Sequence, residues 1–154
     1  MSGKKGYKSL KKKLSLNKLK LVGLDSNIFI YQLHSNPFFG PTVKKEIFIP
    51  LMSGNLKAAT SVITFTEILA LQASVSRISS LKELLLKMSN VTFLDVNQEI
   101  AMEAAEIRRE YGFKLPDAVQ LATALSAKAK AFITNDQRLK AFKKLKVLSL
   151  KEIN

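Results

Sequence analysis

From Leu21 onward, short apolar runs alternate with longer stretches in which apolar residues recur at helical spacing. A short apolar run is typical of a buried strand, and a spacing of three and four residues is typical of an amphipathic helix. Strands that alternate with helices form parallel sheets, because each helix returns the chain to the same edge of the sheet. We therefore expect an α/β fold around a mainly parallel sheet of four or five strands.

The alternation also predicts where the elements lie. Strands are expected at 21–24, 59–63, 91–94, 131–134 and 147–150, and helices at 27–33, 43–52, around 68–71 and 81–88, at 97–111, 115–128 and 136–145. Punctuating residues support these bounds: Asn97 is a good helix cap, Gly54 and Gly112 end helices, and Pro116 is favoured in the first turn of one.

Length and composition limit the class of protein. A chain of 154 residues with 47% hydrophobic content is long enough for one domain with a real core. It has no cysteine, so it holds neither disulfides nor a thiolate metal site, and an intracellular protein is expected. No apolar run reaches the roughly 20 residues of a membrane span, so we expect a soluble, cytoplasmic protein.

The positive charge is concentrated at the start of the chain. The formal net charge is +13, and eight of the 25 basic residues fall within residues 1–20, which contain no acid. Such a segment is typical of a flexible, solvated arm, with the folded domain at 21–154, although the arm could also grip nucleic acid. Four leucines leave two other interpretations open, a short helix packed on the domain or a membrane-surface segment: Leu10, Leu14, Leu16 and Leu19.

Acidic residues are scarce, yet four of them follow strands or begin helices: Asp25, Glu67, Asp117 and Asp136. Each alone could be a helix cap, and Thr64 with Glu67 has the spacing of a capping box. Together they are more informative, because the carboxyl ends of parallel strands meet at one edge of the sheet. Carboxylates clustered there repel one another unless a cation neutralises them, which indicates Mg²⁺ or Mn²⁺.

Other kinds of site find less support. One histidine, His34, cannot build a zinc site, and the chain has no Walker loop, dinucleotide fingerprint or Ser/His/Asp set. A phosphatase with two aspartates two residues apart after its first strand would need an acid where Asn27 stands.

The motifs around the four acids resemble those of the PIN domain, a family that includes the nucleases of bacterial and archaeal toxin–antitoxin pairs. The resemblance runs from about Leu21 to Leu150 and rests on four motifs: Leu24-Asp25-Ser26-Asn27, Ser61-Val62-Ile63-Thr64 leading to Glu67, Lys114-Leu115-Pro116-Asp117-Ala118 with Leu121-Ala122-Thr123-Ala124, and Ile133-Thr134-Asn135-Asp136. It implies a three-layer α/β/α fold in which the four acids are catalytic and bind metal. Asn27, Thr134 and Asn135 then support them.

A metal-dependent endoribonuclease is the function that this resemblance implies. One or two divalent ions would activate a water molecule and leave a 5′-phosphate and a 3′-hydroxyl on the RNA. Four lysines are candidates for holding the RNA backbone, although they could equally be a solvated surface: Lys140, Lys143, Lys144 and Lys146. An acidic antitoxin and a second copy of the chain are the expected protein partners, the second because the helices between residues 43 and 88 offer surplus apolar surface.

Three alternatives remain open at this point. The chain could be a stand-alone RNA-processing nuclease of the same family, and the basic arm would suit that role. It could be a non-catalytic RNA-binding or assembly module that keeps the fold without turnover, although four intact acids argue against this. It could also be a protein whose main role is a partner interface, with the acids serving only as caps.

Overall fold

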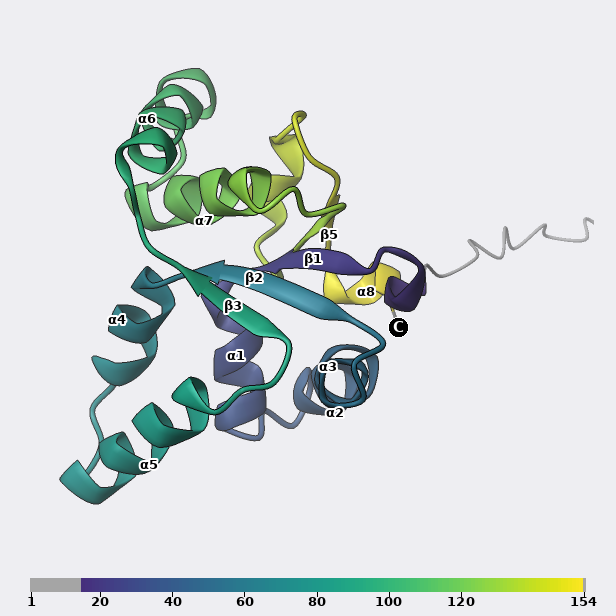
Figure 1. The fold of residues 1–154 in the computed structure, drawn as a ribbon, viewed down its shortest axis with the longest axis vertical. Coiled ribbons are helices and arrows are strands. Elements are labelled where there is room, and N and C mark those ends of the chain that lie inside the picture. The colour runs from purple at the N-terminus through teal and green to yellow at the C-terminus, as the bar shows by residue number, and fades with distance from the viewer. Residues whose placement is uncertain (1–14, 154) are drawn as a thin grey trace, which may run out of the picture.

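Five short strands form one sheet in the computed structural model, and all of them run parallel (Figure 1). The structure describes residues 15–153, and their order across the sheet is β3-β2-β1-β4-β5. The strands are β1 (Leu21–Leu24), β2 (Lys57–Ser61), β3 (Val91–Leu94), β4 (Phe132–Ile133) and β5 (Val147–Leu148). The predicted parallel sheet is confirmed, and it has five strands.

Helices connect the strands and cover both faces of the sheet. The α-helices are α1 (Ser26–Leu33), α2 (Gly40–Val43), α3 (Ile49–Met52), α4 (Ile63–Leu69), α5 (Val75–Leu86), α6 (Gln98–Tyr111), α7 (Leu115–Ser126) and α8 (Leu150–Ile153). Two 3₁₀ helices, η1 (Leu16–Lys18) and η3 (Gln137–Ala141), and the π-helical segment η2 (Lys44–Phe48) complete the described part. Among residues 15–153, no helix combines the length and apolar character of a membrane span.

Two hydrophobic cores, one on each face of the sheet, make the fold three-layered. Helices α6 and α7 lie on one face, and α1 and α5 lie on the other (Figure 1). Alternate strand residues point into opposite cores, so that Phe132 packs under α7 while Ile133 joins the α1 side. Gly23 lets α7 approach β1 closely, because a Cβ built at this position would lie 2.5 Å from the Cβ of Ala124.

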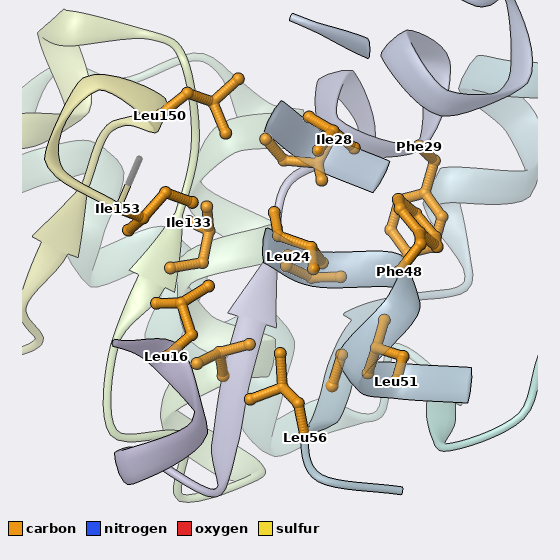
Figure 2. Close-up of a cluster of buried hydrophobic side chains, with 14 of the residues drawn as sticks. Leu16, Leu24, Ile28, Phe29, Phe48, Leu51, Leu56, Ile133, Leu150 and Ile153 are labelled. Carbon is orange, nitrogen blue, oxygen red and sulfur yellow. The ribbon is translucent and has the colours of Figure 1, made fainter. Parts of the chain in front are cut away.

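The α1 core reaches back into the segment before β1. Leu16 of η1 is buried in this core together with Leu150 and Ile153 of α8 (Figure 2). Of the alternatives for this segment, packing on the domain therefore holds for Leu16, and the packed domain begins earlier than residue 21. The rest of the predicted basic arm, residues 1–14, lies outside the described residues.

Several predicted helix bounds need correction. The helix expected at 43–52 begins at Gly40 and contains the π segment Lys44–Phe48, where the Ile49 N–H donates to the Lys44 carbonyl. Pro50 follows directly and has no N–H, so the hydrogen-bond ladder changes spacing where a donor is missing.

The end of the chain also differs from its prediction. The helix expected at 136–145 is only the 3₁₀ helix η3, because Leu139 and Phe142 are both buried and a spacing of three suits a 3₁₀ turn. The strand expected at 147–150 stops at Leu148. Ser149 then caps α8, with its N–H and Oγ bound to Oε2 of Glu152 at 2.7 and 2.9 Å.

Candidate metal centre at the carboxyl edge of the sheet

The four acids reach one edge of the sheet from four different elements. Asp25 follows β1 and Asp136 lies just beyond β4, and these strands are neighbours at the point where the chain crosses from one half of the sheet to the other. In open α/β sheets this crossing point is where ligands bind. Glu67 comes from α4 and Asp117 from the first turn of α7. We call Asp25, Glu67, Asp117 and Asp136 the acidic cluster.

Asp25 is the most buried member of the acidic cluster, with 6% of its surface exposed. Its Oδ2 accepts hydrogen bonds from Thr134 Oγ1 at 2.6 Å and Asn27 Nδ2 at 3.1 Å. Burial raises the pKa of Asp25 to about 6, the Thr134 hydrogen bond opposes this, and the charges of Asp117 and Glu67 raise it further. The negative charges of three acids therefore act on one another across the site.

Glu67 is held by a neighbour of Asp25. Its Oε2 accepts a hydrogen bond from the hydroxyl of Ser26, the first residue of α1. The capping-box interpretation of Glu67 is wrong, because α4 begins before Thr64 and the Thr64 hydroxyl is buried inside the fold. Glu67 is therefore directed toward the acidic cluster rather than toward the start of its own helix.

Asp117 and Asp136 share a guanidinium group. Arg138 Nε donates to both oxygens of Asp136, at 3.0 and 3.2 Å, and its Nη2 bonds to Asp136 Oδ2 and lies 3.5 Å from Asp117 Oδ2. The Arg138 hydrogen bond is the main reason why the pKa of Asp136 is lowered. The pKa of Asp117 is raised, first by burial and then by the charge of Asp136. The two carboxyl groups therefore differ in charge balance although they touch the same arginine.

A buried glutamine joins the elements beneath the acidic cluster. Gln120, one turn after Asp117 on α7, donates from Nε2 to Thr64 Oγ1 at 2.7 Å, and its Oε1 accepts the Ser61 N–H at 3.0 Å. The neighbouring Thr60 hydroxyl bonds to the carbonyl of Leu24, the residue before Asp25, at 2.9 Å. This network links the end of β1, the start of α4 and the first turns of α7.

The chemistry of these groups fits a hard divalent cation. All four members of the acidic cluster offer carboxylate oxygens, and Asn27 Oδ1 beside Asp25 is buried without a hydrogen-bond partner among the described residues. In the observed arrangement, no three acids or histidines of residues 15–153 are close enough to hold one ion. Ser26 holds Glu67 through one carboxylate oxygen, and Arg138 holds Asp136 and lies near Asp117.

The remaining predicted site residues separate into two groups. Thr134 and Asn27 contact Asp25 directly, whereas Asn135 donates to the Tyr31 hydroxyl at 3.1 Å and ties the β4 end to α1. Two of the four candidate lysines form intramolecular ion pairs, Lys140 with Glu152 and Lys144 with Glu103. His34 is exposed at the end of α1.

Three residues of the site were not singled out from the sequence: Ser26, Gln120 and Arg138. Ser26 stands inside a quoted motif, but a serine after an aspartate is also the ordinary start of a helix. Arg138 follows Asp136 by two residues, and this spacing alone does not indicate a contact with Asp117. Gln120 offered one usable signal, because a glutamine between the apolar residues of a buried helix requires hydrogen-bond partners.

Comparison with known proteins gives one family. A model of the PIN domain matches residues 22–145. Solved structures agree in fold. One is the VapBC2 complex from Rickettsia felis, bound to a DNA fragment from its promoter. A chain of this complex has a TM-score of 0.67 and 17% sequence identity, and the match covers 84% of this chain and 98% of that one. A chain of a toxin–antitoxin complex from Klebsiella pneumoniae has a TM-score of 0.63 and 26% sequence identity, and the match covers 86% of this chain and 98% of that one. A chain of DNA-bound VapBC from Salmonella typhimurium has a TM-score of 0.64 and 18% sequence identity, with the same coverage of both chains. A search of curated proteins finds no match.

Proposed function

Because the chain belongs to the PIN domain family, we propose that it is a metal-dependent endoribonuclease and the toxin of a toxin–antitoxin pair. The observation that carries the proposal is that four acids from separate elements lie at the carboxyl edge of the sheet, where like charges raise one another's pKa. The charges of Asp117 and Glu67 raise the pKa of Asp25. The charges of Asp136 and Glu67 raise the pKa of Asp117. A fold maintains such a cluster at a cost in stability, which a bound cation would offset.

In this proposal, all four members of the acidic cluster hold Mg²⁺ or Mn²⁺. The ion would supply the positive charge that activates a water molecule and stabilises the leaving oxygen of the phosphodiester. The chain itself orients the ligands: Thr134 and Asn27 fix the Asp25 carboxylate, and Ser26 holds Glu67 at the same edge. Hydrolysis of this kind leaves the 2′-hydroxyl unused, so the products carry 5′-phosphates and 3′-hydroxyls.

Two kinds of protein partner belong to the proposal. The solved complexes that resemble this chain are toxin–antitoxin complexes, and a net charge of +13 favours an acidic antitoxin.

A second copy of the chain is supported by exposed apolar side chains on α3 and α5, among them Met52, Leu84 and Leu86. A groove of about 540 Å³ between these helices and α1 adds to this apolar surface. Light scattering of the purified chain tests the homodimer, and co-purification with the protein encoded beside it tests the antitoxin.

The test of activity uses end-labelled single-stranded RNA with Mn²⁺ or Mg²⁺, compared with EDTA and with Asp25→Asn. Cleavage lost in both comparisons, with 5′-phosphate products, supports the proposal. The matched control is Asp95→Asn, which removes one carboxylate from an exposed position after β3 and leaves the acidic cluster intact. Cleavage that survives EDTA, or products with cyclic phosphates, would contradict the proposed chemistry.

A further inference from the structure

Arg138 occupies an unusual place for a surface arginine, because its guanidinium bridges two acids of the candidate metal centre. Nε donates to both oxygens of Asp136, and Nη2 donates to Asp136 and to Asp117 at 3.5 Å. The Arg138 N–H also donates to Asp136 Oδ1 at 3.0 Å. A planar guanidinium with several donors matches a carboxylate in this way better than any other cationic side chain.

In the part of the chain that the structure describes, no second side-chain cation makes such a contact. Within residues 15–153, Arg138 forms the only ion pairs with the acidic cluster, through Asp117 and Asp136. Lys114 lowers the pKa of both aspartates through its charge and has no ion pair with either. Asp25 and Glu67 are bound by uncharged groups, the side chains of Thr134, Asn27 and Ser26.

The acidic cluster is therefore divided by charge. Arg138 neutralises Asp136. Asp25 is buried and Asp117 is partly buried, and the negative charges of other acids raise the pKa of both, which the charge of Arg138 opposes only in part at Asp117. The guanidinium engages both oxygens of Asp136, and these oxygens and those of Asp117 are the groups that a divalent ion would use. A guanidinium and a divalent ion on the same carboxylates would repel each other, so the two cations exclude one another at this position.

We propose that Arg138 is a built-in competitor of the metal ion, which sets the metal concentration at which the site fills. The inference rests on the proposed function, because it takes the acidic cluster as the metal site. When Arg138 holds Asp136 and Asp117, its guanidinium occupies both oxygens of Asp136 and one of Asp117, and no three acids or histidines of residues 15–153 lie close enough to hold one ion. When the ion binds, Arg138 leaves these acids and its positive charge becomes available to an RNA phosphate.

The proposal differs from a purely structural role. If Arg138 only fixed the first turn of η3 or oriented Asp136 for the metal, its removal would weaken metal binding. If it competes with the metal, its removal strengthens metal binding. The sign of the change in Mn²⁺ affinity therefore decides between the two roles, and this readout does not depend on RNA cleavage.

The experiment is a Mn²⁺ titration of the full chain, in which the electron paramagnetic resonance signal of free Mn²⁺ reports the bound fraction. We expect Arg138→Gln to lower the Kd for Mn²⁺ at least five-fold. Arg138→Lys, which keeps the charge and loses the planar fork, should lie between wild type and Arg138→Gln. The matched control is Arg77→Gln, which removes the same charge from α5, where Arg77 donates to the Leu33 carbonyl. Its Kd should equal that of wild type.

The outcomes separate the two proposals. Saturable binding with an unchanged or higher Kd in Arg138→Gln overturns the competition and leaves the metal site intact. Binding that Asp25→Asn does not abolish, or no saturable binding in any variant, overturns the metal site and with it the competition. Circular dichroism of metal-free samples establishes that the variants are folded, and Arg138→Lys alone still tests the sign if Arg138→Gln does not fold.

Discussion

Thr134 donates a hydrogen bond of 2.6 Å to the Asp25 carboxylate, and this contact joins the carboxyl ends of β4 and β1. The same hydroxyl oxygen accepts the Asp136 N–H at 3.0 Å and lies 3.3 Å from Asn27 Nδ2. One buried hydroxyl therefore connects two acids of the cluster with the start of α1. It compensates only part of the cost of burying Asp25, whose pKa remains raised.

The burial of Asp25 predicts an unusual pH dependence of stability without metal. Its pKa is 3.8 as an ordinary aspartate and about 6 in the fold, so the fold binds this proton more tightly than the unfolded chain does. Protonated Asp25 therefore contributes its full share to the free energy of unfolding below pH 3.8, and this contribution is lost as the pH rises through about 6. We expect this group to cost about 2–3 kcal/mol at pH 7.5. Urea unfolding in EDTA between pH 4 and 7.5 measures it.

Asp25→Asn isolates this effect, because the amide has the same shape and does not titrate. The variant should match wild type near pH 4 and exceed it in free energy of unfolding at pH 7.5. Asp95→Asn, at an exposed position, should follow wild type throughout. An Asp25→Asn variant that is less stable than wild type at pH 7.5 would falsify the prediction.

Gln120 predicts a large loss of stability from a small change. Gln120→Leu keeps the size of the side chain but leaves the buried Ser61 N–H and Thr64 hydroxyl without this partner. An unsatisfied buried polar group costs about 1–3 kcal/mol, and we expect a loss of about 2–3 kcal/mol in the free energy of unfolding. Gln72→Leu, at an exposed position, should stay within about 0.5 kcal/mol of wild type. Equal losses in the two variants would show that the network is not a source of stability.

Gly23 is predicted to tolerate no side chain. A Cβ at this position would lie 2.5 Å from Ala124 Cβ and 2.9 Å from Phe132 Cδ2, so Gly23→Ala should lower the free energy of unfolding by about 1–3 kcal/mol. Thermal unfolding measures the change, and adding Ala124→Gly should recover part of it. In Gly40→Ala the nearest atom would be 3.5 Å away, and we expect no loss. Similar melting temperatures for the two alanine variants would contradict the packing argument.

The candidate RNA-binding lysines should not contribute equally. Lys140 and Lys144 are already paired with acids, whereas Lys143 and Lys146 form no ion pair within residues 15–153. Replacing Lys143 and Lys146 by glutamine should weaken RNA binding and lower the slope of log K against log salt by about 1.4, which is 0.7 for each phosphate contact. Fluorescence anisotropy with labelled RNA at several salt concentrations measures both. The matched double variant at Lys140 and Lys144 should change the slope less, and a larger change there would reverse the assignment.

The sequence was sufficient for the sheet because each strand lies in or beside a short apolar run between helix signals. The least accurate strand is β2, which is Lys57–Ser61 rather than the predicted 59–63. The sequence did not provide the strand order, since β1 pairs with β4 across more than 100 residues of sequence and no local pattern indicates that pairing. It also predicted the end of the chain wrongly, as a strand at 147–150 where a helix begins at Leu150. The capping pair of Ser149 and Glu152 competes with an apolar pattern that equally suits a strand, and only the burial of Leu150 and Ile153 decides for the helix.

The candidate site was predictable to the level of where each acid stands along the chain. Strand ends of a parallel sheet meet at one edge, so the positions of Asp25 and Asp136 at strand ends predict that the two residues lie near each other. The directions of the side chains do not follow from sequence, because they depend on contacts between distant segments. The Ser26 contact with Glu67 spans 41 residues, and the Arg138 contact with Asp117 spans 21.

The packing of Leu16 beside Leu150 and Ile153 brings the two ends of the described chain together (Figures 1 and 2). A circularly permuted protein could therefore join residue 153 to residue 15 through a short linker. It could be reopened at Gly54, which lies in an exposed turn before β2. That opening is at the amino end of the strands, opposite the acidic cluster. Chain connectivity and the candidate metal centre can thus be altered independently.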